Sequence, residues 1–109
     1  MKTLGEVKVG DEFYLIYYST EGNCLLNVRK YTVSIINEIQ IGKIIKWIDN
    51  AGNIRGTTIS KEKYNDVMDN AFYECKICLD KEFVLKFIED DKNDQIEKYK
   101  KMLKLLSDD

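Results

Sequence analysis

Two cysteines with the spacing Cys-x-x-Cys, Cys75 and Cys78, are the residues whose types most directly suggest chemistry. Such a pair serves in zinc sites, which need four ligands, and in redox sites, where the first cysteine begins a helix. The only other cysteine is Cys24, there is no histidine, and the pair falls within a segment of strand character. Residues three apart on a strand point to opposite faces, so the two sulfurs should diverge. We therefore interpret the pair as packing residues and expect no metal and no other cofactor.

The other residue combinations that carry catalysis are also missing from the sequence. Without histidine, the chain has neither the usual acid–base group near neutral pH nor a Ser–His or Cys–His nucleophile pair. Its six glycines never gather into a phosphate-binding loop. The acidic run at 89–94 lacks the spaced oxygen ligands and the central glycine of a calcium loop. The sequence therefore predicts a protein that is not an enzyme.

Basic and aromatic side chains gather on two neighbouring strand-like segments: Lys43, Lys46, Trp47 and Arg55. An exposed ring between cations on a small β-barrel can stack a nucleobase while the cations hold its phosphate. On a pleated strand, however, Lys43 and Trp47 lie on one face and Lys46 lies on the other. The net charge of −2 also gives no support to binding a polyanion. We favour a core position for Trp47 with solvated lysines, and keep nucleic-acid binding by these four residues as the alternative.

Tyrosines and a C-terminal apolar stripe are more typical of protein contacts. Tyrosine buries area while keeping a polar tip, and of the adjacent Tyr17 and Tyr18 one should be exposed, since neighbours on a strand face opposite ways. Near the C-terminus, apolar residues recur at spacings of three, four and three, which places them on one helix face. The predicted partner-binding residues are therefore Tyr17, Tyr18, Ile96, Tyr99, Leu103 and Leu106.

Most of the elements that would position these residues lie in 1–60, which is mainly strand. Aromatic and β-branched residues predict a strand at 13–18, and alternating residues predict one at 24–39 with a bulge or turn near Asn37-Glu38. The chain continues as strand at 41–48 and, after a turn, at 54–59. Ser60 and Asp80 are candidate N-caps for a short helix near 61–69 and for a helical segment at 81–106. Residues 71–79 between them return to strand character. The polar run 89–95 leaves open whether 81–106 is one helix or two.

These elements make up a single domain of 109 residues with an α+β fold. We expect a small β-barrel or a strongly bent antiparallel sheet of about five strands, followed by the helical segment. The N-terminal residues do not resemble a signal peptide, and the apolar runs are too short to span a membrane. An odd number of cysteines fits a reducing compartment. We therefore expect a cytoplasmic protein without a membrane partner.

Several short motifs resemble those of the small SH3-like β-barrel proteins of phages and mobile elements. They are Val9-Gly10-Asp11, Tyr31-Thr32-Val33, the strand–turn–strand that ends at Ile59, and the step from 71–80 into Phe83. In that family a VGD turn opens the barrel and a final strand runs into a C-terminal helix. This chain departs from the pattern after Val33, where the family's basic and aromatic residues are replaced. The resemblance implies an SH3-like barrel and a phage setting, in which some members bind host proteins, and it assigns no functional residue.

Two functional hypotheses follow. The first is a non-enzymatic protein-binding module, such as a phage accessory protein or an inhibitor of host defence that acts in the host cytoplasm. Its partner would be another protein or a second copy of the chain in a homodimer. The alternative is a small nucleic-acid-binding β-barrel. The position of Trp47 discriminates between them, because a buried ring cannot stack a base on the outer surface.

Overall fold

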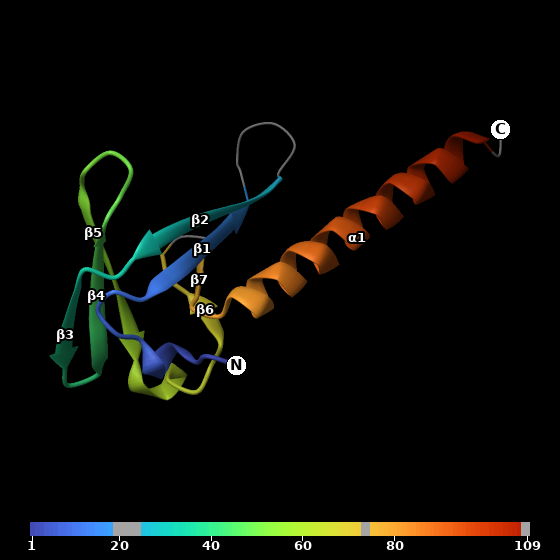
Figure 1. Cartoon of the computed structure of the whole chain (residues 1–109). Coiled ribbons are helices and arrows are strands. Elements are labelled where there is room, and N and C mark those ends of the chain that lie inside the picture. Colours follow the sequence, from blue (N-terminus) through green and yellow to red (C-terminus); the bar gives the residue numbers. More distant parts are fainter. Residues whose placement is uncertain (19–24, 73–74, 108–109) are drawn as a thin grey trace.

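The computed structural model describes residues 1–18, 25–72 and 75–107. Within these residues the chain forms seven strands and one long helix, so the α+β expectation is confirmed (Figure 1). In chain order the elements are the 3₁₀ turn Leu4–Glu6, β1 (Glu12–Tyr18), β2 (Leu26–Thr32), β3 (Ile35–Ile39), β4 (Gly42–Ile48), β5 (Ile54–Ser60), the 3₁₀ turn Lys61–Lys63, β6 (Met68–Asn70), β7 (Lys76–Cys78) and α1 (Lys81–Ser107).

The strands belong to two antiparallel sheets. One sheet has the order β2-β1-β7-β6 and the other the order β3-β4-β5. Among the described strands these sheets do not close into a barrel. The architecture is thus two packed sheets. It has seven strands rather than the expected five, because 24–39 forms two strands and because β6 was not expected, whereas β7 lies within the predicted segment 71–79.

The segment 24–39, expected to form one bent strand, is in fact two strands in different sheets. The change of sheet occurs at Val33, whose amide donates to the carbonyl of Asp11 at 2.9 Å, and at Ser34, whose amide donates to the carbonyl of Lys46 at 2.8 Å. The bend expected at Asn37-Glu38 is therefore wrong, because both residues pair with β4 inside β3. The crossing places β2 and β4 on opposite sides of one core.

That core fills the space between the two sheets. Its centre is Trp47, whose ring meets the ring of Phe13 edge-on at a centroid distance of 5.0 Å. Alternation along β1 decides what each residue contacts: Phe13 and Leu15 pack in this core, whereas Ile16 packs in a second cluster with Cys78 and Val84. The second cluster lies under the first turns of α1, so β1 is covered on both of its faces.

The short helix expected near 61–69 is wrong. Only the 3₁₀ turn Lys61–Lys63 forms there, the Ser60 side chain makes no cap hydrogen bond, and β6 begins at Met68. Asp80, in contrast, caps α1 as expected, because its Oδ1 accepts the backbone N–H of Phe83 at 2.9 Å. The open question of one helix or two is also answered, since α1 runs without a break through the polar residues 89–95.

Helix α1 projects from the body of the molecule, and its C-terminal half stands clear of both sheets (Figure 1). This projection gives the chain its elongated shape, with extents of 61 × 31 × 21 Å. Within the part of the chain that the structure describes, no helix is both long and apolar enough to cross a membrane.

Candidate functional site

The four residues of the nucleic-acid hypothesis do not converge on one surface. Trp47 is only 1% exposed, so its ring belongs to the core, the position that the sequence favoured. Lys43 shares the inward face of β4 with Trp47 and is held there: its Nζ donates to the carbonyl of Gly5 at 2.9 Å and lies 5.2 Å from the centre of the Tyr64 ring. Lys46 lies on the opposite face of β4. Only Trp47 and Arg55 line a common cavity.

The two cysteines of the Cys-x-x-Cys pair lie on opposite faces of the first sheet. Cys75 packs in the core between the sheets, and Cys78 packs in the cluster under α1. Burial raises the pKa of both thiols, which opposes the thiolate form that nucleophiles and metal ligands need. No cluster of metal-ligating side chains occurs in residues 1–18, 25–72 and 75–107. The geometry agrees with the packing role predicted for this pair; Cys24 lies outside the described residues.

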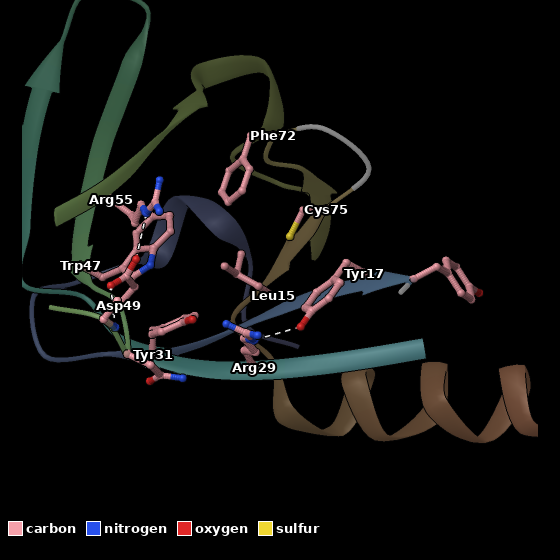
Figure 2. A pocket seen from close by; sticks show the side chains of 12 residues that line it. Leu15, Tyr17, Arg29, Tyr31, Trp47, Asp49, Arg55, Phe72 and Cys75 are labelled. Atoms are coloured by element: carbon pink, nitrogen blue, oxygen red, sulfur yellow. Dashed lines mark hydrogen bonds and ion pairs between the residues drawn. The ribbon is translucent and has the colours of Figure 1, made fainter. Parts of the chain in front are cut away.

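A groove opens where the space between the two sheets reaches the surface, and we call it the aromatic groove. Figure 2 shows side chains from both sheets pointing into it. Its volume is about 840 Å³, within the range of small-molecule sites. It is lined by Leu15, Tyr17, Tyr18, Arg29, Tyr31, Trp47, Asp49, Asn50, Ala51, Arg55, Phe72 and Cys75.

Two guanidinium groups in the aromatic groove are held in place by neighbouring side chains (Figure 2). Arg29 Nε donates to the hydroxyl of Tyr17 at 2.9 Å, and its guanidinium lies over the Tyr17 ring. Hydrogen bonds to the hydroxyls of Tyr31 and Tyr17 raise the pKa of Arg29. Arg55 Nε donates to Asp49 Oδ2 at 2.9 Å, and this bond is the main reason why the pKa of Asp49 is lowered. The groove thus combines flat apolar walls with two oriented cations.

Tyr17 and Tyr18 face opposite ways, as predicted for neighbours on a strand. Tyr17 lies half-buried in the aromatic groove, whereas Tyr18 lies at the edge of its lining, is 42% exposed and reaches α1. The Tyr18 hydroxyl donates to Asp91 Oδ1 at 2.7 Å, and this hydrogen bond raises the pKa of Tyr18. Tyr18 therefore helps to fix the direction in which the helix leaves the body.

The predicted C-terminal stripe lies on the projecting part of α1, far from Tyr17. Its members are exposed: Ile96 by 40%, Tyr99 by 59%, Leu103 by 66% and Leu106 by 74%. We call these four residues the distal stripe. Leu85 and Ile88 extend it toward the body, since spacings of three and eight keep them on the same helix face. Nothing in the described part of the chain covers this face.

The sequence did not point to most of the aromatic groove. Arg29, Tyr31, Asp49 and Phe72 come from three segments that are distant in the sequence, and alternation gives only the face of each strand. One signal was present: Arg29 and Tyr31 share a face of β2, which pairs with β1 beside Tyr17. Comparison of the chain with family models, with curated proteins and with solved structures yields no match. The aromatic groove and the distal stripe are therefore the features that bear on function.

Proposed function

We propose that this chain is a non-enzymatic protein-binding module whose docking element is the projecting end of α1. The observation that carries the proposal is the distal stripe, a row of apolar side chains that stays exposed on a helix standing clear of the sheets. Apolar patches of this kind mark interaction sites on proteins in water. The resemblance to small SH3-like phage proteins supports an accessory role or inhibition of host defence in a cytoplasmic setting.

Charge along α1 favours a second copy of the chain as the partner. Between residues 89 and 97 the helix carries five acidic side chains and one lysine, and between 98 and 104 it carries four lysines and no acid. Two such helices lying antiparallel bring the acidic segment of each beside the basic segment of the other, whereas a parallel pair opposes like charges. Overlap of 88–106 in both copies would also set Ile88 opposite Leu106. We therefore propose an antiparallel homodimer.

The test measures the molar mass of the purified full-length chain by light scattering over a range of concentrations. Wild type should form a dimer, and Leu103→Glu should be a monomer, because a charge then lies in the apolar contact. Leu105→Glu is the matched control: Leu105 is also highly exposed, 75% against 66% for Leu103, but it lies off the distal stripe, so this variant should still dimerise. A wild-type chain that stays monomeric at all concentrations would exclude self-association, and equal loss of the dimer in both variants would show that the distal stripe is not the contact.

A further inference from the structure

The aromatic groove is not used by the proposed helix contact, and its chemistry differs from that of the distal stripe. The rings of Tyr31 and Phe72 lie beside the ring of Trp47, with ring centres 6.1 and 6.4 Å from the centre of the Trp47 ring. Such walls favour a flat ligand ring, because stacked or edge-on aromatic contacts add to the free energy of burial. The apolar part of a ligand for this groove should therefore be a ring.

The charged groups of the groove favour an anion. Both carboxylate oxygens of Asp49 are already occupied, Oδ1 by the amides of Ala51 and Asn53 and Oδ2 by Arg55. Asp49 thus balances one guanidinium, and Arg29 leaves the charged lining with a net charge of +1. In the described part of the chain, Arg55 has no acidic partner besides Asp49, and Arg29 has no acidic partner. Arg55 bonds Asp49 through its Nε, and Arg29 bonds Tyr17 through its Nε and also bonds the Tyr31 hydroxyl. A guanidinium has five N–H donors, so both arginines keep terminal N–H groups that can bind phosphate oxygens.

We propose that the aromatic groove binds a nucleoside phosphate, with the base against Tyr31 and Phe72 and the phosphate held by Arg29 and Arg55. The volume of the groove suits a ligand of this size. A long nucleic acid along the surface is disfavoured, because the chain has a net charge of −2 and Lys46 faces away from the groove. A free nucleotide and the terminal nucleotide of a single strand share the proposed chemistry.

The experiment titrates the full-length chain with AMP, GMP, CMP and UMP. Trp47 is the only tryptophan and lines the groove, so its fluorescence reports occupancy, and calorimetry gives the stoichiometry. At least one nucleotide should bind saturably to one site. Arg29→Met and Arg55→Met should each weaken binding by about tenfold or more, since each removes a charge-assisted pair of hydrogen bonds. Lys46→Met is the matched control, because it removes the same charge outside the groove, and it should bind like wild type.

Further ligands test the base and the phosphate separately, and they distinguish a free nucleotide from the terminal nucleotide of a strand. Adenosine and inorganic phosphate should each bind more weakly than AMP. An oligoadenylate that binds more tightly than AMP, with the same dependence on Arg29, identifies a strand end as the source; a weaker one identifies the free nucleotide. The proposal is overturned if none of the four nucleotides binds by fluorescence or by calorimetry. It is also overturned if Lys46→Met loses as much affinity as the arginine variants, or if adenosine binds as well as AMP. Because the distal stripe is untouched, failure here leaves the helix proposal standing.

Discussion

The position of the single tryptophan distinguishes the two functional hypotheses. Trp47 is surrounded by Phe13, Tyr31 and Phe72, and almost none of its surface reaches solvent. We predict that Trp47→Ala lowers the free energy of unfolding by about 3–5 kcal/mol, as large-to-small changes in cores do. Urea denaturation followed by circular dichroism measures the loss. Trp47→Phe, which keeps a ring in place, should lose less. A stable Trp47→Ala variant would show that the ring is not part of the core.

A second residue tests the cost of an unpaired polar group. The Tyr64 hydroxyl is buried and has no hydrogen-bond partner among the described residues, while the Tyr64 ring packs below Lys43. Burial also raises the pKa of Tyr64. We predict that Tyr64→Phe leaves the free energy of unfolding unchanged or raises it by up to about 1 kcal/mol, because a desolvated group without a partner is removed. Thermal and urea unfolding would measure this change.

Tyr18→Phe is the matched control for this prediction. It removes the same atom, but the Tyr18 hydroxyl is bonded to Asp91 on α1, so the variant should lose stability. If Tyr64→Phe were the more destabilising of the two, the Tyr64 hydroxyl would have to be bonded in solution.

At the scale of elements, the junction between β7 and α1 is held by one carboxylate. Asp80 accepts the backbone N–H of Lys2 at 2.8 Å and that of Phe83 at 2.9 Å, and these two bonds lower the pKa of Asp80. A carboxyl whose pKa is lower in the folded than in the unfolded state stabilises the fold above its unfolded pKa. That stabilisation is lost as the pH falls through the folded pKa.

We therefore predict that Asp80→Ala lowers the free energy of unfolding by about 1 kcal/mol near neutral pH, the usual effect of losing an N-cap. The difference from wild type should shrink below about pH 4, because wild-type Asp80 is then increasingly protonated. Urea unfolding of both proteins across this range measures it. Asp80→Asn keeps a capping oxygen without the charge and should fall between the two. A difference that does not change with pH would show that the charge of Asp80 contributes nothing.

The elements that alternation or a cap specified were predictable from the sequence. β1 is rich in aromatic and β-branched residues, β4 buries the alternate residues Ile45 and Trp47, and α1 has both its Asp80 cap and helical spacing. The run 89–95 does not end α1, because it contains no glycine or proline and a solvated turn needs no apolar residue. The helix at 61–69 was mispredicted because Tyr64, Val67 and Met68 have helical spacing. In the structure the carbonyl of Tyr64 instead accepts the amide of Gly5 in the other 3₁₀ turn, and Met68 pairs with Cys78 in the sheet. The way the two sheets face each other depends on contacts between distant segments, which no local sequence pattern contains. The aromatic groove between the sheets could therefore not be predicted.

At the scale of the whole molecule, the body and the projecting helix should be separable. Val84 is the buried residue of α1, and among the described residues the last hydrogen bond from α1 to the body is the one between Asp91 and Tyr18. We predict that a chain ending at Gln95 keeps the two sheets and stays monomeric. At concentrations where wild type is also a monomer, its free energy of unfolding should equal that of wild type. A truncated chain that unfolds at such concentrations would show that the distal residues belong to the core.

Among the described residues, in contrast, no hydrogen bond or ion pair joins residues 92–107 to the two sheets. A helix of sixteen residues, about 24 Å long, is marginal in water when it packs against nothing. The helical signal in circular dichroism should therefore rise with protein concentration, as the dimer forms and covers the distal stripe.

The effect of salt on dimerisation tests the relative orientation of the two helices. An antiparallel pair, which joins acidic and basic segments, should dissociate more readily as salt screens that attraction, whereas a parallel pair would be relieved of repulsion and associate more strongly. Sedimentation of wild type at low and high salt distinguishes the two, and tighter association at high salt would contradict the antiparallel arrangement.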